Sequence, residues 1–464
     1  MVFSIENSDI VQGFSRASQS KCYVQRPTSV NQLQDLISHA QSQQKTICPM
    51  GSGNSYGDEF QNQDEVVLDM TQMNQVISWD PETGVMVVEP GVTFQQALRV
   101  CLKDNWVLPV VPGTRLPSIG GAAANNVHGK NSYKDGNFGN CIIEFDLVLA
   151  NNEVITCSRD NNSDMFFAAI GGIGMLGIFT SLTLQTRKVK SPSVSVRKWT
   201  VPNLAKMLQD IAEYSEKSDY IIGQIDCFAL GKRLGRGTIH AAVHADYESD
   251  NYIHDLEIGN TIFSVIPSKL VLIVGKLLMG RKLMRTISSL KYYMNMSNQS
   301  NSREGKIESF TRFNFILDRI PDWPKVFKYG FYEFEPLIPR DKAYAVINEM
   351  IRITHEFEML PYLCGVKLHS EDEFVLSYSL DGFSIGFDFP VLPKRNKEQD
   401  EMFSQLHEIV VENSGQVFLA KDNLVCKSHF GNIYGSKINQ FLSLKAKYDP
   451  NMLFQSNMFR RLFL

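Results

Sequence analysis

The chain has 464 residues, of which 43% are hydrophobic and 21% are charged, and its formal net charge is −4. This length exceeds one ordinary hydrophobic core, so two domains are expected. The slight excess of acidic residues argues against non-specific binding to nucleic acid, and no nucleic-acid partner is expected.

The N-terminus, MVFSIENSDI, has acidic residues where a secretory signal needs a basic region. No apolar run reaches the roughly 20 residues that span a bilayer. The eight cysteines show no Cys-x-x-Cys spacing, which favours reduced thiols over a disulfide framework or a zinc site. These features predict a cytoplasmic protein without a metal ion.

A helix and a short strand precede the first glycine-rich loop. Ser29 can cap a helix over residues 30–40, whose apolar side chains share one face. Residues 46–48 then predict a strand that leads into the loop GSGNSYGD at residues 51–58. Backbone N–H groups in such a loop can form an anion-binding nest, although the same residues also suit an ordinary tight turn.

Two strands and a helix lead to the stretch around which the chain is organised. Residues 66–70 and 85–89 predict the strands, and the turn at residues 80–84 indicates a hairpin. Thr93 can cap the amphipathic helix that follows. Next comes PGTRLPSIGGAAANNVHGKN at residues 112–131, where glycines stand among small and amide residues. Such a backbone can approach a flat, phosphate-bearing ligand closely, because few Cβ atoms intervene.

A third glycine-rich segment, GGIGMLG, contains the pattern Gly-x-Gly-x-x-Gly at Gly172, Gly174 and Gly177. The dinucleotide-binding fingerprint requires a strand before this pattern and a long helix after it. Here a predicted helix precedes it and the β-rich residues 178–184 follow, so we reject that interpretation. Three glycine-rich turns between short apolar strands instead suggest one large cofactor.

The sequence changes character after the basic run at residues 187–190. Beyond it the patterns predict strands of a second sheet at residues 194–201, 221–230, 239–245, 331–337, 362–369, 374–378, 385–389 and 415–420. Helices are predicted at residues 341–351, 402–411 and 438–448. His240 and His244 lie in a predicted strand with no acidic residue to complete a site, so no metal site is expected there.

The segment from Ile262 to Lys291 alternates apolar runs with lysines and arginines. It is too interrupted to span a bilayer. A basic, apolar helix pair can lie in a membrane interface or cover an apolar substrate chain. The alternative is a buried helix or lid whose lysines are solvated.

Taken together, these segments resemble the flavoprotein oxidases of the vanillyl-alcohol oxidase family, whose FAD-binding domain is named after p-cresol methylhydroxylase (PCMH). The resemblance rests on the short matches SYGD, LDMT, PGTR, GGA, HGKN, FGN, DFP, AKD and RRL. Within the family it is closest for the oxidase components of decaprenylphosphoryl-β-D-ribose 2′-epimerases. It is strong over residues 51–177 and near the C-terminus, and weak over residues 194–310.

The resemblance implies an α+β fold. A PCMH-type FAD-binding domain of two α/β subdomains would occupy residues 1–190. A substrate-binding domain built on an antiparallel sheet flanked by helices would occupy residues 191–410, and residues 411–464 would return to the FAD-binding domain. Family members with covalent flavin often have Gly-x-Gly-His-Ser in the first loop, whereas this chain has Asn54, so non-covalent FAD is expected.

The resemblance also assigns candidate FAD contacts. They are Gly51, Ser52, Gly53, Asn54, Ser55, Tyr56 and Gly57 in the first loop, Gly113, Ser118, Ile119, Gly120, Gly121, Asn125 and His128 in the second stretch, Ile178 in the third, and Phe418 and Lys421 near the C-terminus.

For the chemistry, the resemblance implies that hydride passes from a substrate carbon to flavin N5 while the hydroxyl proton passes to a base. Lys421 is the candidate cation that stabilises the reduced flavin near N1, or the base if burial lowers its pKa. Lys367 matches a second lysine on the substrate side. Tyr56 and His128 are expected at the reactive edge, although a histidine next to glycine is more often a structural hydrogen-bonding residue.

Several positions depart from the related oxidase. Glu333 and Glu335 replace glutamines, Gly386 replaces a cysteine, and Phe418 replaces a tyrosine. The two glutamates, Lys367 and Ser384 are the candidate substrate contacts. Two added carboxylates predict a different sugar or polyol as substrate.

The predicted function is FAD-dependent oxidation of a secondary hydroxyl of a sugar, such as the 2′-hydroxyl of a polyprenylphosphoryl pentose. A short-chain reductase partner would complete an epimerisation in cell-wall or glycan biosynthesis, and residues 262–291 would contact the inner membrane peripherally. One alternative is a soluble sugar or alditol oxidase that uses oxygen. The other is a flavin-binding protein without turnover, against which the intact Lys421, Lys367 and His128 argue.

Overall fold

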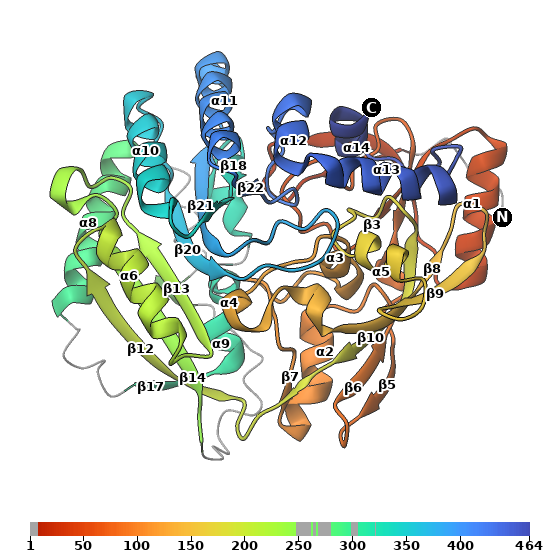
Figure 1. Ribbon diagram of the computed structural model, residues 1–464, viewed down its shortest axis with the longest axis horizontal. Helices are drawn as coiled ribbons and strands as arrows, with labels where there is room; N and C mark the ends of the chain where they lie inside the picture. The colour runs from red at the N-terminus through yellow and green to blue at the C-terminus, as the bar shows by residue number, and fades with distance from the viewer. Residues whose placement is uncertain (1–7, 247–260, 263–265, 268–279, 298–304, 321) are drawn as a thin grey trace.

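The computed structural model describes residues 8–246, 261–262, 266–267, 280–297, 305–320 and 322–464. The N-terminal third of the chain lies beside a large antiparallel sheet formed by the middle of the chain, and the C-terminal helices return over the N-terminal third (Figure 1). An antiparallel sheet flanked by helices beside a mixed α/β region agrees with the α+β fold that was predicted. The domain division near residues 190 and 410 stays a prediction.

The N-terminal third contains two sheets. In the order β1-β2-β4-β3, strand β4 pairs in parallel with both β2 and β3, and the order β5-β6-β10-β8-β9 is antiparallel throughout. The strands are β1 (Asp9–Gln12), β2 (Gln19–Gln25), β3 (Ile47–Met50), β4 (Val66–Asp69), β5 (Val76–Asp80), β6 (Val85–Val88), β8 (Ile142–Val148), β9 (Val154–Ser158) and β10 (Ile178–Gln185), with the short pair β7 (Trp106–Val107) and β11 (Arg187–Lys188).

The predicted helix starts at Ser29 and Thr93 are confirmed. The Ser29 hydroxyl accepts the backbone N–H of Gln32 at 3.3 Å, and Thr93 forms a reciprocal capping box with Gln96. The helices of this part are α1 (Val30–Ser42), α2 (Phe94–Cys101), α3 (Ile119–Ala124), α4 (Ser132–Asp135) and α5 (Ser163–Ala169). Because α5 precedes GGIGMLG and β10 follows it, the rejection of a dinucleotide fingerprint is also confirmed.

The predicted hairpin between residues 66–70 and 85–89 is wrong. The turn at residues 80–84 joins β5 to β6, whereas β4 belongs to the other sheet. The residues of β5 show no alternating apolar pattern, because all its side chains are exposed or half-buried.

The middle of the chain forms one antiparallel sheet in the order β17-β12-β14-β13-β20-β21-β19-β22, with β18 also paired to β21. Its strands are β12 (Ser193–Val201), β13 (Tyr220–Ile225), β14 (Gly237–His244), β17 (Lys306–Ser309), β18 (Phe331–Phe334), β19 (Pro336–Pro339), β20 (Leu363–His369), β21 (Gly382–Pro390) and β22 (Gln416–Val417). The helices packed against it are α6 (Leu204–Ser215), α8 (Arg281–Ser297), α9 (Phe310–Asn314), α10 (Ala343–Glu356) and α11 (Asn396–Glu412).

Four strand predictions in this part need correction. Of residues 221–230, only the residues up to Ile225 are strand, in β13. Residues 331–337 form two strands that stay in one register against β21, with a break at Glu335 before Pro336, which has no N–H to donate. Residues 374–378 form no strand; they are buried in a loop, in which Phe374 packs against Phe166 and Phe167. Of residues 415–420, only β22 is a strand.

His240 and His244 lie on β14, as the strand prediction required. Within the described ranges, no three or more His, Cys, Asp or Glu side chains are grouped so that they could hold a metal ion. Half of residues 262–291 lies outside the described part of the chain. Its described pieces are β15 (Thr261–Ile262), β16 (Ile266–Pro267) and the first turns of α8. No helix among the described residues is long and apolar enough to cross a membrane.

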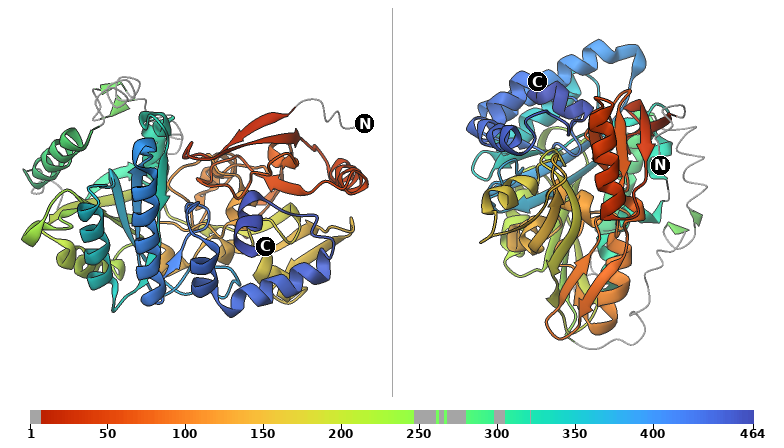
Figure 2. Two further views of the ribbon diagram at one scale, coloured as in Figure 1. Left: turned by 90° about the horizontal axis from the view of Figure 1, so that it is seen from above. Right: turned by 90° about the vertical axis from the view of Figure 1, so that its right-hand side faces the viewer.

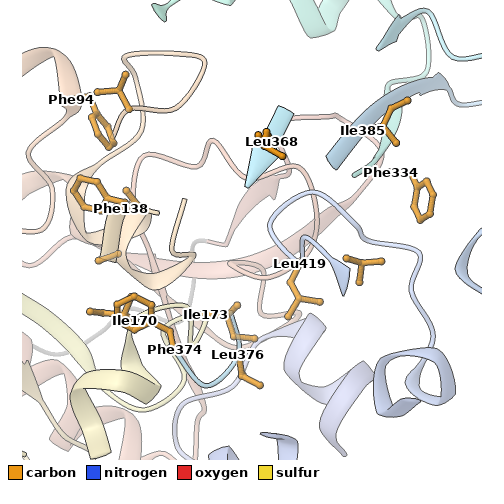
Figure 3. Close-up of a cluster of buried hydrophobic side chains, with 14 of the residues drawn as sticks. Phe94, Phe138, Ile170, Ile173, Phe334, Leu368, Phe374, Leu376, Ile385 and Leu419 are labelled. Carbon is orange, nitrogen blue, oxygen red and sulfur yellow. The ribbon is translucent and has the colours of Figure 1, made fainter. Parts of the chain in front are cut away.

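One hydrophobic core continues from the N-terminal third into the middle sheet. Phe94, Phe138 and Ile170 lie at one end of the labelled cluster, and Phe334 and Ile385 at the other (Figure 3). The two regions are therefore packed together by buried side chains as well as by the chain connection.

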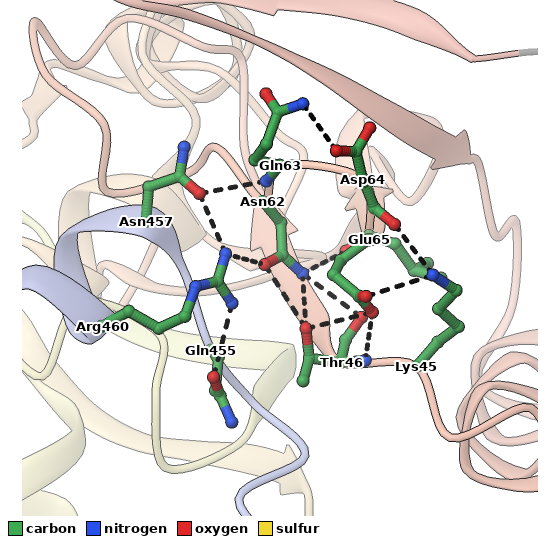
Figure 4. Close-up of polar contacts among 10 residues, drawn as sticks. Lys45, Thr46, Asn62, Gln63, Asp64, Glu65, Gln455, Asn457 and Arg460 are labelled. Carbon is green, nitrogen blue, oxygen red and sulfur yellow. Dashed lines mark hydrogen bonds and ion pairs between the residues drawn. The ribbon is translucent and has the colours of Figure 1, made fainter. Parts of the chain in front are cut away.

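The C-terminal segment is bound to the N-terminal sheet. Its helices are α12 (Lys427–Tyr434), α13 (Ser436–Tyr448) and α14 (Asn457–Phe463), and they lie alongside the N-terminal elements in two views (Figure 2). Ile47 of β3 bridges to Phe454, and Arg460 of α14 donates to Asn62 at 2.8 Å (Figure 4). Residues at opposite ends of the chain thus complete one structural unit.

Candidate functional site

A cavity of about 490 Å³ lies between the glycine-rich loops and the middle sheet. The loops 49–56, 111–130 and 173–179 line one part of it. The opposite part is lined by side chains from β13, β14, β20 and β21, by one face of α8, and by the turn that follows β22.

Most of the predicted cofactor contacts line this cavity. They are Gly51, Ser52, Gly53, Asn54, Ser55, Tyr56, Gly113, Ser118, Gly120, Gly121, Asn125, His128, Ile178, Phe418 and Lys421. Gly57 and Ile119 are buried next to it but are not part of its wall. Of the predicted substrate contacts, Glu333, Glu335 and Lys367 line the cavity and Ser384 does not.

Ser118 joins the first two glycine-rich stretches. Its hydroxyl accepts the N–H of Ser52 at 3.3 Å and that of Gly121 at 3.4 Å. A Cβ atom at Gly51 would collide with this hydroxyl, and Gly53 has the left-handed φ of 66° that favours glycine. The two loops therefore approach each other closely enough to present backbone N–H groups to one anionic ligand, such as a pyrophosphate.

Three buried side-chain oxygens next to the cradle, which residues 51–56 and 118–121 form, have no hydrogen-bond partner among the described residues. They are both carboxyl oxygens of Glu59 and the Oδ1 atom of Asn125, whose Nδ2 atom donates to Gly121 at 3.1 Å. Burial raises the pKa of Glu59 to about 8, so the carboxyl is a neutral hydrogen-bond donor near pH 7. Unpaired buried groups in a cavity wall fit a large polar cofactor such as FAD.

Sequence reasoning missed Glu59, although a signal was present. The residue directly follows the SYGD match, so an acid was placed next to a loop predicted to hold a pyrophosphate. Such an acid is compatible with an anion only when it is protonated or turned away.

Lys421 lies between two buried glutamates. Its Nζ atom is 2.7 Å from Glu333 Oε1 and 2.7 Å from Glu335 Oε2. Burial opposes the charge, but the two carboxylates raise the pKa of Lys421 well above its ordinary value. A raised pKa favours the charged ammonium form of Lys421, and the two roles considered for it stay predictions.

Glu335 connects the remaining polar groups of the cluster. Lys367 Nζ lies 3.3 Å from Glu335 Oε1 and 3.3 Å from His128 Nδ1, and His128 Nε2 lies 3.4 Å from Glu335 Oε2. Against the effect of burial, Lys367 and Lys421 hold the pKa of Glu335 well below its ordinary value. Burial, then the charge of Lys367, lowers the pKa of His128 to about 4, so its imidazole is neutral near pH 7.

Asp388 is a further cavity residue that sequence reasoning did not single out. It lies opposite Glu333 in the register of β18 and β21. Burial and then the charge of Glu333 raise the pKa of Asp388 well above its ordinary value, and burial also raises that of Glu333. A state in which Glu333 and Asp388 share one proton is therefore favoured over one in which both are ionised.

Tyr56 and Ser384 occupy supporting positions. The Lys421 ammonium lies 5.4 Å from the centroid of the Tyr56 ring, and the backbone N–H of Tyr56 donates to Ala420 at 2.8 Å. The cradle loop and the turn that carries Lys421 are therefore directly connected. The Ser384 hydroxyl lies behind the cavity wall, 3.4 Å from Glu335 Oε1 and 2.8 Å from the ring of His369.

Comparison with known proteins identifies two family models in the chain. The model of an FAD binding domain matches residues 22–158, and that of D-arabinono-1,4-lactone oxidase matches residues 323–462. The first range contains the glycine-rich cradle, and the second contains the glutamates and lysines of the charged cluster.

Individual relatives are similar to different shares of the chain. The decaprenylphosphoryl-β-D-ribose oxidase of Mycolicibacterium smegmatis is 27% identical over 432 residues, which cover 90% of this chain and 89% of the relative. A putative D-arabinono-1,4-lactone oxidase of Neurospora crassa is 32% identical over 36% of this chain and 30% of its own length. The L-gulonolactone oxidase of Bos taurus is 26% identical over 42% of this chain and 43% of its own length.

Proposed function

We propose that this chain, which belongs to the family of FAD-dependent sugar and lactone oxidases, oxidises a secondary hydroxyl of a polyprenylphosphoryl sugar. The observation that carries the proposal is the extent of the similarity. The relative named for a decaprenylphosphoryl sugar aligns with nine-tenths of this chain, whereas the lactone oxidases described above align with less than half of it.

The chain is an FAD-dependent oxidoreductase, so the alternative of a flavin protein without turnover is set aside. When bound, FAD supplies the two-electron oxidant. We assign its phosphates to the backbone of residues 51–56 and 118–121. We further propose non-covalent binding, since Asn54 occupies the histidine position of the covalent members and its amide donates to Ser52.

The charged cluster supplies the remaining chemistry. The ammonium of Lys421 opposes negative charge that develops at the reacting centre. Lys367 donates a hydrogen bond to the substrate hydroxyl, and neutral His128 orients Lys367. The carboxyl pair of Glu333 and Asp388 accepts the hydroxyl proton, because a carboxylate whose pKa is raised is an effective base near neutral pH.

The substrate test is an anaerobic absorbance titration of the holoenzyme. Farnesylphosphoryl ribose and farnesylphosphoryl arabinose should bleach the flavin absorbance, whereas L-gulono-1,4-lactone, D-arabinono-1,4-lactone and xylitol should not. Bleaching by a lactone or xylitol alone would reject the lipid-linked substrate. It would support a lactone or polyol oxidase, the second candidate, which the match at residues 323–462 favours.

We also propose that α8 contacts the membrane in which such a substrate resides. The helix has no acidic residue, and Ile287, Leu290 and Met294 on it are 44%, 59% and 48% exposed. The protein should sediment with phosphatidylglycerol vesicles, and a Leu290→Asp, Met294→Asp variant should not. Equal sedimentation of both proteins would refute this contact. We propose in addition that a reductase partner reduces the oxidised sugar and so completes an epimerisation.

A further inference from the structure

The end of the cavity away from Lys421 is lined by one face of α8. The lining residues of this helix are Met284, Ile287, Ser288, Lys291 and Tyr292. Spacings of three and four residues place these side chains on one side of the helix. The helix lies at the outer edge of the middle sheet (Figure 1) and contacts the strands β12 and β14.

Polar contacts hold α8 in this position. Arg236, which is buried, donates to Ser289 Oγ at 2.8 Å, and its guanidinium lies 4.8 Å from the centroid of the Tyr292 ring. Asn295 donates to Thr238 Oγ1 at 3.1 Å. The face that carries Lys291 is therefore fixed over the sheet.

The floor between the charged cluster and α8 is a row of residues in register across the sheet. Gly386 pairs with Gly365, Gly365 pairs with Gln224, and Gln224 pairs with Thr238. A Cβ atom at Gly365 would meet only the end of Ile222, at 3.9 Å, and backbone of Gly223, at 4.0 Å. A ligand can therefore lie flat from the glutamates toward Gln224.

The lysines at the two ends of this floor have different partners. Lys367 and Lys421 are bound to glutamates. Lys291 Nζ instead donates to the neutral amide oxygen of Gln224 at 2.8 Å. Asp226, the carboxylate that lines this end, is engaged by Arg236 through bonds of 2.9 and 3.0 Å. Burial lowers the pKa of Lys291, and no carboxylate among the described residues is paired with it, so an anion placed there would favour its charged form.

We propose that Lys291 and Gln224 form a subsite for the phosphate of the substrate, with its hydrocarbon chain leaving along Met284 and Ile287. Adjacent strands lie about 4.8 Å apart, so Gln224 is roughly 10 Å from Gly386, a distance that a sugar ring and its phosphate cover. The choice of a sugar as the oxidised group rests on the proposed function. Binding of the phosphate at Lys291 and Gln224, and of the hydrocarbon chain along α8, does not depend on the reaction.

The test is to measure by calorimetry how tightly soluble probes bind to the holoenzyme. The probes are farnesyl phosphate, farnesol and inorganic phosphate. Lys291→Met should weaken farnesyl phosphate binding about tenfold, as expected from the loss of one charge-assisted hydrogen bond, and leave farnesol binding unchanged. The matched control Lys282→Met removes an exposed lysine of the same helix that is not part of the cavity wall, and it should bind like the wild type.

If the Lys291→Met variant binds farnesyl phosphate as tightly as the wild type does, the phosphate subsite is overturned. Inorganic phosphate that binds as tightly as farnesyl phosphate would overturn the lipid part and indicate a free phosphate or sugar phosphate. If no polyprenylphosphoryl sugar bleaches the flavin while Lys291→Met still weakens farnesyl phosphate, the proposed function fails and the subsite stands. Bleaching with an unchanged KM in Lys291→Met would leave the function and reject the subsite.

Discussion

The FAD cradle and the charged cluster border the same cavity but are built in opposite ways. The cradle consists largely of backbone, brought together by glycines and by the hydroxyls of Ser118 and Ser52. The cluster consists of side chains, with Glu335 bound to Lys367, Lys421 and His128. We therefore expect damage to the cradle to appear in cofactor affinity, and damage to the cluster in the rate of the reaction.

The largest effect is expected for Lys421→Met. Removing the ammonium leaves Glu333 and Glu335 without their shared partner, and the rate of anaerobic flavin bleaching should fall about 10³-fold. FAD content should stay close to that of the wild type. The control Lys394→Met removes an exposed lysine outside the cavity wall and should not alter the rate. A tenfold or smaller loss would mean that the cluster does not act on the reaction.

Gly51→Val is expected to have the complementary effect. The added side chain would collide with Ser118 and separate the two loops, so FAD affinity should fall about 10²-fold. Fluorescence titration of the flavin-free protein measures this. Gly431→Ala in α12 is the control, because a Cβ atom there meets nothing within 4 Å, and it should bind FAD normally. Unchanged affinity in Gly51→Val would remove the cradle from the FAD site.

The contrast between these regions also shows what the sequence could predict. The cradle loops and the caps at Ser29 and Thr93 depend on residues close together in the chain. The two caps are confirmed, and most of the loop residues that were predicted line the cavity. The partners of Glu333 and Lys421 could not be obtained in this way. They depend on the register of β18 against β21 and on the position of the turn after β22, which only the fold determines.

Residues 374–378 illustrate a related difficulty. An apolar run can be buried in a strand or in a loop, and periodicity alone does not distinguish the two. Here Phe374 packs against Phe166 and Phe167, and the segment has no strand partner among the described residues. The apolar pattern predicted the burial of this segment and misassigned its secondary structure.

The smallest of the expected effects concerns pH and Glu59. Its folded-state pKa is raised to about 8 from 4.5, chiefly by burial, with Asp58 and Arg461 as the nearby charges. The stability that the neutral carboxyl contributes is fully present below pH 4.5 and is lost as the pH rises through about 8. FAD affinity should therefore fall about tenfold between pH 7 and pH 9, because ionised Glu59 would repel the phosphates.

Glu59→Gln keeps a neutral side chain of the same shape, so its FAD affinity should be flat over this pH range. The measurement is FAD dissociation by fluorescence at pH 6 to 9 for both proteins. Parallel pH profiles would show that Glu59 does not face the cofactor. If FAD affinity is independent of pH in the variant alone, Glu59 is the titrating group next to a cradle made largely of backbone.

The most direct test of the account is the rate of anaerobic flavin bleaching with farnesylphosphoryl ribose that carries deuterium at C2 of the sugar. We predict that bleaching occurs and that deuterium slows it several-fold in the wild type, because the C2–H bond breaks in the step that the charged cluster assists. Failure of this sugar to bleach FAD-replete protein, or bleaching at the same rate with and without deuterium, would contradict oxidation of the secondary hydroxyl at that carbon.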